Sequence, residues 1–210
     1  MKDTVIVFAR APRLGTLKRR LAADLGERAA LRFHLATLRR LLRRLRADRR
    51  FRTVLAATPD AARWPPDPAW RGLPRIPQGR GDLAARMHRA FARFPRTRVA
   101  LVGCDIPAVD AADLAACFRA LGRADAAFGP AQDGGYWLVA MARRRPAHPF
   151  ARVRWSGPHA LADTARNFAG RRVATLRTLR DVDTAADLAT QEASMGAAQT
   201  RKGSEDPLIP

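Results

Sequence analysis

The feature that most constrains the fold is an alternation of short apolar runs with longer amphipathic stretches along almost the whole chain. Seven runs have the length and composition of buried strands. They lie at residues 4–9, 53–57, 73–76, 99–102, 126–129, 136–141 and 173–176. The repeated strand–helix order predicts a mainly parallel sheet with helices on both faces.

The stretches between these runs have the spacing of helices. In residues 27–50 leucines recur at steps of three and four, which places them on one helix face. Further helices are expected at residues 16–24, 81–94, 110–121 and 156–169, with a short one after Asp183. Thr16 and Asp110 are the expected caps of two of these helices, because their side-chain oxygens can accept hydrogen bonds from free backbone N–H groups.

Length and composition indicate one packed domain. The chain has 210 residues, of which 47% are hydrophobic, enough for a single α/β core. We expect the domain to span residues 1–195 and the polar, aperiodic residues 196–210 to form a disordered tail. No apolar run approaches the ~20 residues of a membrane helix, and the N-terminal residues lack the pattern of a signal peptide. The expected location is the cytoplasm.

The formal net charge of +20 raises the possibility of a nucleic-acid partner. All but three of the 39 basic residues are arginine, and they are spread along the chain. A nucleic-acid site would concentrate its charge on one face, among aromatic residues. Nucleic acid is therefore an unlikely partner, although the charge should attract phosphorylated small molecules. Lys18 stands out as the one lysine away from the chain ends.

The segments that follow the strands are the candidate ligand-binding loops, because ligands of such folds bind beyond the carboxyl ends of the strands. After the first run, residues 9–21 form a turn that is rich in cations and opens a helix. Free N–H groups and cations there favour a phosphate site. The spacing matches neither the P-loop nor G-x-G-x-x-G, so an ordinary turn in an arginine-rich chain stays an alternative.

Acidic residues follow several of the later runs. Asp105 comes directly after run 99–102, where a carboxylate is costly unless it is paired or binds a metal such as Mg²⁺ or Mn²⁺. Helix capping is the other explanation, but Asp110 is better placed for it. Asp133 precedes two glycines, which permit a positive φ or a close backbone approach. A hairpin turn explains the same string.

Two further loops have a similar character. Residues 77–82 are a glycine-rich approach to a helix, with one cation and one acid. Residues 181–184 place two carboxylates before the last helix, where Asp183 or Thr184 could act as its cap.

In order and spacing, these loops resemble the nucleotide-diphospho-sugar transferase superfamily, which has the glycosyltransferase-A fold. The closest likeness is to a bacterial family formerly of unknown function, whose members are now generally described as glycosyltransferases. The motifs are residues 8–21, 78–87, 103–107, 129–136, 155–158 and 181–184, and the agreement covers about residues 3–190. The resemblance implies a three-layer Rossmann-like α/β fold. Its mixed, mostly parallel sheet would have about seven strands, one of them antiparallel, with helices on both faces.

The resemblance also implies roles for individual residues. The nucleotide side would comprise Ala9, Arg10, Pro12, Gly15, Lys18, Arg20, Gly79, Gly81 and Asp82. The acceptor side would comprise Gly134, Gly135, Tyr136, Trp155 and Ser156. Asp105, Asp133 and Lys18 would be catalytic, and Asp105 and Asp183 would hold Mg²⁺ or Mn²⁺.

The chain departs from the family pattern at a few positions. Arg10 and Arg19 stand where a lysine and a threonine are usual, Cys104 where a serine is expected, and Gly157 where a threonine is expected. Arg10 keeps the positive charge but differs from lysine in geometry. The three acids expected in the site are all present, which argues against an inactive enzyme.

Three functions stay open at this point. The first is a metal-dependent glycosyltransferase with a nucleotide-diphospho-sugar donor and an unknown small acceptor, in which Asp133 takes the acceptor proton. The second is a nucleotidyltransferase that uses an NTP, resembling phospholactate guanylyltransferase or the molybdenum-cofactor nucleotidyltransferases. Many such enzymes have paired glycines in the first loop, and their absence here favours the sugar transferase. The third is a basic nucleic-acid-binding protein, which would leave the acidic loops unexplained. The sequence leaves the oligomeric state open.

Overall fold

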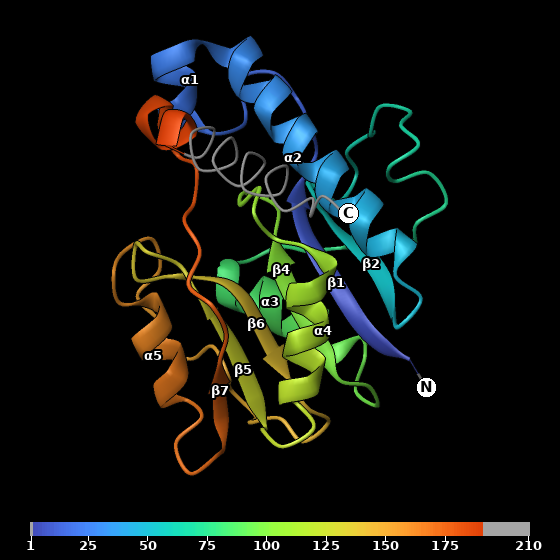
Figure 1. The fold of residues 1–210 in the computed structure, drawn as a ribbon, viewed down its shortest axis with the longest axis vertical. Helices are drawn as coiled ribbons and strands as arrows, with labels where there is room; N and C mark the ends of the chain where they lie inside the picture. The colour runs from blue at the N-terminus through green and yellow to red at the C-terminus, as the bar shows by residue number, and fades with distance from the viewer. Residues whose placement is uncertain (1, 191–210) are drawn as a thin grey trace, which may run out of the picture.

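The computed structural model describes residues 2–190 of the chain, which form one seven-stranded α/β sheet with helices (Figure 1). The strands are β1 (Asp3–Arg10), β2 (Phe51–Thr58), β3 (Arg75–Pro77), β4 (Val99–Gly103), β5 (Ala126–Pro130), β6 (Tyr136–Met141) and β7 (Val173–Thr175). Their order in the sheet is β3-β2-β1-β4-β6-β5-β7. β6 is antiparallel to both of its neighbours, and all other pairs are parallel. The predicted mixed, mostly parallel sheet is confirmed.

Five helices connect these strands. They are α1 (Arg19–Leu25), α2 (Glu27–Ala47), α3 (Leu83–Ala92), α4 (Ala111–Ala120) and α5 (Ala160–Arg166). Residues 185–190 are also helical, up to the end of the described residues. The predicted domain boundary at residue 195 and the predicted tail, residues 196–210, lie outside the described residues.

Each face of the sheet has its own hydrophobic core. Val5 and Val7 of β1 pack with leucines of α2 and with residues of α4, whereas Ile6 packs on the opposite face with α3 and with Phe168. Neighbouring strand residues point to opposite faces, and both faces of β1 are buried. This burial explains why its sequence is a continuous apolar run rather than an alternating one. With helices packed on both faces of the sheet, the structure has three layers.

The carboxyl ends of the six parallel strands meet at one edge of the sheet. β1 ends at Arg10 and β4 at Gly103, in adjacent register, and β5 ends at Pro130 two positions along the sheet. Because β6 runs the other way, its first residue, Tyr136, lies at the same edge. The loops selected from the sequence as candidate ligand-binding loops are therefore gathered at this one edge, which we call the ligand edge.

Two helix starts differ from expectation. Thr16 is not a cap: α1 begins later, with Lys18 at its N-cap position, and the Thr16 hydroxyl instead donates to the Arg13 carbonyl. α5 begins at Ala160 rather than at Ser156, because Ser156 has a φ of 62°, outside the helical range. Asp110 is confirmed as a cap and forms a capping box with Asp113.

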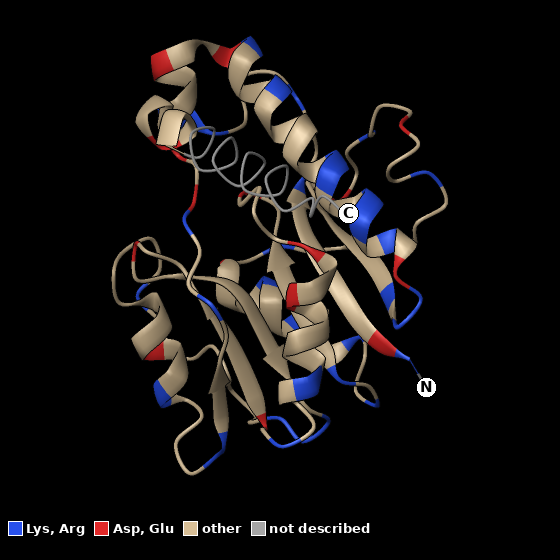
Figure 2. Cartoon of the chain, in the orientation of Figure 1, with Lys and Arg blue, Asp and Glu red and all other residues tan. Residues whose placement is uncertain are grey.

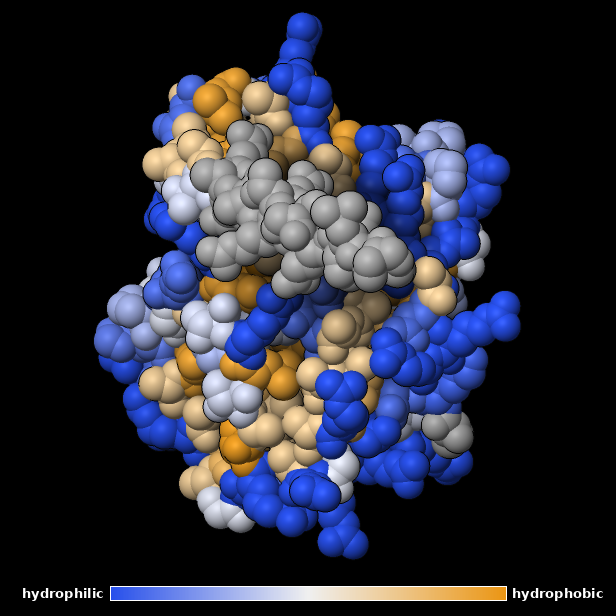
Figure 3. Space-filling model, viewed as in Figure 1, coloured by the Kyte–Doolittle hydropathy of each residue, from blue (hydrophilic) through white to orange (hydrophobic). Residues whose placement is uncertain are grey.

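Basic residues are spread over the surface. Figure 2 shows them on α2, on α4 and on loops at the end of the sheet away from the ligand edge. Figure 3 shows that hydrophilic residues surround much of the face drawn there. Within residues 2–190, no helix combines the length and apolar character that crossing a membrane requires.

A buried carboxylate, Asp163 of α5, holds the preceding loop in place. It accepts hydrogen bonds from the backbone N–H and the guanidinium of Arg154, and it also pairs with Arg166. Hydrogen bonds from the Arg154 side chain hold the pKa of Asp163 well below its ordinary value. This anchor fixes the backbone directly before Trp155 and Ser156.

Replacing Asp163 with Asn should lower Tm by roughly 4 °C or more at pH 7, because several charge-assisted hydrogen bonds are lost. The folded-state pKa is depressed, so the stabilisation is present above the unfolded-state pKa of about 4 and disappears as the pH falls below it. The Tm difference between wild type and variant should therefore narrow in acid. Thermal melts between pH 7 and pH 3 measure it.

Glu27→Gln is the matched control, since it removes an equal charge from an exposed position. A Tm difference for Asp163→Asn that is no larger than that of the control would contradict the anchoring role of Asp163. A Tm difference that grows in acid would contradict it too.

Candidate active site

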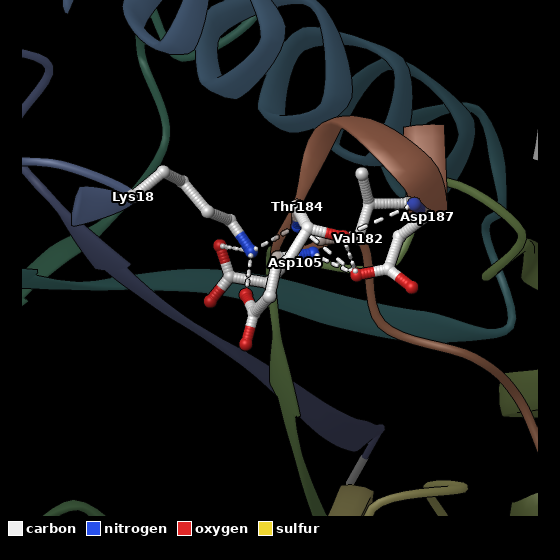
Figure 4. Close-up of polar contacts among 6 residues, drawn as sticks. Lys18, Asp105, Val182, Thr184 and Asp187 are labelled. Carbon is white, nitrogen blue, oxygen red and sulfur yellow. Dashed lines mark hydrogen bonds and ion pairs between the residues drawn. The ribbon is translucent and has the colours of Figure 1, made fainter. Parts of the chain in front are cut away.

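Lys18 connects three separate parts of the chain at the ligand edge. Its Nζ donates to the Val182 carbonyl at 2.9 Å and to Asp183 Oδ1 at 2.9 Å, and lies 3.2 Å from Asp105 Oδ1 (Figure 4). Only 7% of the side chain is exposed. Burial alone lowers the pKa of Lys18, but Asp105 and Asp183 outweigh that effect and the pKa is raised. The ammonium therefore stays charged at neutral pH.

The backbone of Lys18 is in the left-handed conformation, with φ 47° and ψ 58°. Non-glycine residues rarely adopt this region, and those that do cluster at functional sites. Here the conformation starts α1 from a turn that contains Gly15 (φ 74°). The predicted phosphate loop is thus a tight turn at a helix start.

The carboxylate of Asp187 fixes the segment that carries Asp183. It accepts hydrogen bonds from the backbone of Asp183 and from both the N–H and the hydroxyl of Thr184, and Asp187 N–H in turn contacts the Thr184 hydroxyl. This is a capping box at the start of the last helix. Hydrogen bonding by Thr184 lowers the pKa of Asp187 to about 2. Thr184, one of the two caps considered, is thus the cap, which leaves the Asp183 side chain for Lys18.

Asp105 lies between two cavities. The first, of about 550 Å³, is lined by cations: Arg10, Lys18 and Arg19. The turn residues around Gly15, the buried His34 and Asp183 complete its wall. A polyanion such as a diphosphate would meet positive side chains and the start of α1 in this cavity.

The second cavity, of about 310 Å³, has aromatic walls. Tyr136, Trp137 and Trp155 line it together with Asp133 and Asp181. The Tyr136 and Trp155 rings are 6.4 Å apart, nearly edge to face. Burial raises the pKa of Tyr136 far above its ordinary value, so the phenol is neutral. The cavity therefore offers flat apolar surfaces beside carboxylates.

Four carboxylates gather around this edge: Asp105, Asp133, Asp181 and Asp183. Burial, followed by repulsion from Asp133 and Asp183, raises the pKa of Asp181 to about 6. Asp181 Oδ1 is buried and has no hydrogen-bond partner among the described residues. A buried acceptor of this kind is costly unless something binds it. In a chain of charge +20, this edge is locally acidic.

These carboxylates fit the predicted divalent cation. Mg²⁺ and Mn²⁺ prefer carboxylate oxygens and complete their shells with phosphate oxygens and water. Asp181 lines the cavity that Asp105 also lines, and its Oδ1 has no hydrogen-bond partner among the described residues. The donor set thus supports the expected metal, with Asp181 as a further candidate beside the two expected ligands.

Two side chains close to Asp105 in the first cavity, those of His34 and Cys104, are not carboxylates. His34 of α2 is 2% exposed, and its Nε2 lies 3.2 Å from the Arg10 carbonyl oxygen. Burial lowers the pKa of His34, so the imidazole is neutral at neutral pH. Cys104 is also buried, and burial raises the pKa of its thiol well above the ordinary value. Both groups are uncharged next to the acidic edge.

Side-chain hydrogen bonds hold the loop at residues 78–82 in place. Gln78 Nε2 donates to the carbonyls of Ala9 and Ala56, which fixes the loop to the ends of two strands. Arg89 donates to backbone carbonyls on both sides of Gly79. A Cβ on Gly79 would lie 2.3 Å from the Arg89 guanidinium, and the φ of 79° also requires glycine. Asp82 caps α3.

The two glycines after Asp133 have distinct tasks. Gly134 has a φ of 83°, and a Cβ there would lie 2.4 Å from the Pro158 carbonyl. Its own carbonyl accepts from Leu161 N–H at the start of α5. Gly135 N–H donates to Asp133 Oδ1 at 2.8 Å, which orients that carboxylate. The close backbone approach inferred from the glycine pair is an approach to Pro158.

Most of the residues selected from the sequence line the cavities. Arg10, Gly15, Lys18 and Asp183 line the first, Asp105 lines both, and Asp133, Gly135, Tyr136, Trp155 and Ser156 line the second. Neither cavity is lined by Ala9, Pro12, Arg20, Gly79, Gly81, Asp82 or Gly134. The assigned roles of all these residues, those that line a cavity included, stay predictions.

Sequence reasoning assigned no role to Asp181 or His34. Asp181 belongs to a quoted motif, but its burial could not be read from the sequence. His34 is a single polar residue in a leucine-rich helix, where a core histidine is the usual explanation. Only the tertiary structure distinguishes His34 from an ordinary core histidine, because α2 passes beside the end of β4.

Several known structures share this fold. A protein of Desulfovibrio desulfuricans G20, provisionally described as a nucleotide-diphospho-sugar transferase, is 28% identical with a TM-score of 0.78, covering 90% of this chain and 85% of that one. CMP:2-keto-3-deoxy-manno-octonic acid synthetase with CTP is 13% identical with a TM-score of 0.56, covering 94% and 100%. A manganese complex of Rv0371c from Mycobacterium tuberculosis H37Rv is 19% identical with a TM-score of 0.54, covering 92% and 100%.

The fold is therefore that of the nucleotide-diphospho-sugar transferase superfamily, as the sequence motifs indicated. The search of curated proteins gives no match. A family model described as "Uncharacterized protein conserved in bacteria (DUF2064)" matches residues 41–157, more than half of the chain, including β4 and Asp105. The chain belongs to this DUF2064 family.

Proposed function

We propose that the chain is a metal-dependent glycosyltransferase that moves a sugar from a nucleotide-diphospho-sugar to the hydroxyl group of a small acceptor. The observation that carries the proposal is the position of Asp105 between a cationic and an aromatic cavity. A transferase needs two substrates with their reacting atoms at a shared boundary. The chain is a transferase: its 28% identical neighbour, described provisionally as one, matches over 90% of its length.

The cationic cavity suits the donor's diphosphate. Lys18 and Arg10 would neutralise its charge, and the N–H groups at the start of α1 would add the positive end of the helix dipole. Mg²⁺ or Mn²⁺, held by Asp105 with Asp181 and Asp183, would stabilise the charge of the departing nucleoside diphosphate.

The aromatic cavity suits the transferred sugar and the acceptor. Tyr136 and Trp155 offer ring surfaces against which apolar sugar faces can pack. Asp133, which also lines this cavity, is the carboxylate that can take the proton of the acceptor hydroxyl, since Asp181 is assigned to the metal. The new glycosidic bond would form as the bond to the diphosphate breaks.

The second candidate is a nucleotidyltransferase. It is supported by the central position of Lys18 in the cationic cavity and by the fold shared with a CTP-bound synthetase. In that reaction Lys18 would stabilise the phosphorus under attack, and pyrophosphate would leave. The aromatic cavity favours the sugar transferase. Either donor is a cytoplasmic metabolite, so the predicted cytoplasmic location belongs to the proposal.

Thermal-shift titration with nucleotides and nucleotide-sugars, each with and without Mn²⁺, separates the two candidates. We expect a nucleotide-diphospho-sugar or its NDP to raise Tm only when Mn²⁺ is present, since the carboxylates alone would repel the diphosphate. Stabilisation by NTPs alone, with pyrophosphate release, would replace the proposal by the second candidate.

Asp105→Asn should abolish the Mn²⁺-dependent stabilisation by NDP and lower the Tm of the free protein only modestly, because Lys18 keeps Val182 and Asp183 as partners. Donor turnover should fall by about 100-fold or more. Asp125→Asn is the control, because Asp125 precedes β5 at the far end of the sheet. Retained Mn²⁺-dependent NDP binding in Asp105→Asn would remove Asp105 from the site.

Lys18→Met should separate phosphate binding from metal binding. Losing the ammonium removes the cation that pairs with Asp105 and Asp183, so Mn²⁺ alone should bind at least as tightly as in wild type. NDP affinity in saturating Mn²⁺ should fall by about tenfold or more. Isothermal titration with each ligand measures both. Unchanged NDP affinity would show that Lys18 is purely structural.

A further inference from the structure

Three metal-binding side chains of different chemical type converge at one corner of the cationic cavity. A ring nitrogen of His34, the Cys104 sulfur and an Asp105 oxygen all lie within 4.8 Å of one another. His34 comes from α2, and the other two follow β4. All three line the first cavity. This cluster differs in composition from the carboxylate set proposed to hold Mg²⁺ or Mn²⁺. The two sets share Asp105.

The donor types favour a different cation from the one bound by carboxylates. Mg²⁺ prefers oxygen ligands, whereas imidazole nitrogen together with thiolate sulfur favours Zn²⁺ and chemically similar ions. Sites with three protein ligands and one open position are typical of zinc bound where a small molecule also enters. Here the open position would face the cavity.

The surroundings of His34 prepare it as a ligand. Its Nε2 lies 3.2 Å from the Arg10 carbonyl oxygen, which can only accept a hydrogen bond, so the proton belongs on Nε2. That leaves Nδ1 with its lone pair. Metal-binding histidines characteristically donate their second ring N–H to a backbone carbonyl or a carboxylate in this way.

The Asp105 side chain completes the cluster from the solvent side. It is 52% exposed, whereas His34 and Cys104 are almost fully buried, so an ion would enter from the cavity. Lys18 Nζ pairs with Oδ1 of Asp105, which leaves Oδ2 for an ion. Modest rotation of this exposed side chain can bring its oxygen to bonding distance.

We propose that His34, Cys104 and Asp105 form a binding site for Zn²⁺ or a similarly thiophilic divalent cation. On binding, the metal displaces the Cys104 thiol proton, which passes to solvent, and forms bonds to sulfur, nitrogen and oxygen. If the proposed function holds, zinc competes with Mn²⁺ for Asp105 and acts as an inhibitor. The site itself does not require that function.

Titration of the metal-free full-length protein with Co²⁺, in the absence of nucleotide, tests the site directly. We expect thiolate-to-cobalt charge-transfer absorption in the near ultraviolet at one equivalent of Co²⁺. Zn²⁺ should abolish the absorption by displacement, and an excess of Mg²⁺ should not. His34→Gln should weaken Co²⁺ binding by at least about tenfold.

The two cysteines provide a matched pair of variants. Both are buried, free and part of the same hydrophobic core, but Cys117 lies in α4 and does not line the first cavity. Cys104→Ala should lose the charge-transfer absorption, and Cys117→Ala should retain it. Circular dichroism confirms the folding of each variant, and His34→Gln tests the site independently of either cysteine.

The proposal is overturned if wild type shows no charge-transfer absorption, if Cys104→Ala retains it, or if His34→Gln binds Co²⁺ as wild type does. Because these measurements contain no nucleotide, they are independent of the donor. Zinc binding without any effect on Mn²⁺-dependent NDP binding would keep the site and remove only its inhibitory consequence.

Discussion

The Lys18 ammonium group is the interaction on which the geometry of the ligand edge depends. It joins the loop after β1 to the end of β4 through Asp105, and to the segment before the last helix through Val182 and Asp183. Lys18 and Asp183 are 165 positions apart in the chain. A charged group with 7% exposure needs such partners, because an unpaired buried charge is expensive. Binding chemistry and tertiary structure therefore rest on the same side chain.

The fold was largely accessible from the sequence because its determinants are local. Buried parallel strands have continuous apolar runs, and amphipathic helices repeat at three and four residues, so the order of the elements was visible. The resemblance supplied the expectation of one antiparallel strand, whereas the register of the sheet and the identity of that strand, β6, come from the structure. The predicted start of α1 was wrong because the Thr16 hydroxyl donates to the Arg13 carbonyl instead of capping the helix. Lys18, in the left-handed backbone conformation, occupies the N-cap position. Nothing in local propensity predicts a lysine in that conformation.

The candidate site was accessible only in part. Residues that follow strands, such as Asp105 and Asp133, could be selected because the ends of parallel strands meet. The contribution of His34 depends on where α2 crosses the sheet, and that of Asp181 on burial beside other acids. Both are tertiary properties. Gly79 and Gly134, selected as ligand-facing glycines, have Arg89 and Pro158 as close neighbours, and their ligand roles stay predictions. A glycine signal alone does not reveal what approaches it.

The reversed direction of β6 has a consequence for how such a protein can change over evolution. The cationic cavity is built from the ends of β1 and β4, whereas the aromatic cavity is built from the turn into β6 and from the loop before α5. Asp105 and Phe8 are the residues common to both linings. Substitutions in the β5–β6 turn or near Trp155 can therefore alter one compartment while the other keeps its shape. The two halves of the site can diverge independently, as exchangeable modules on one sheet.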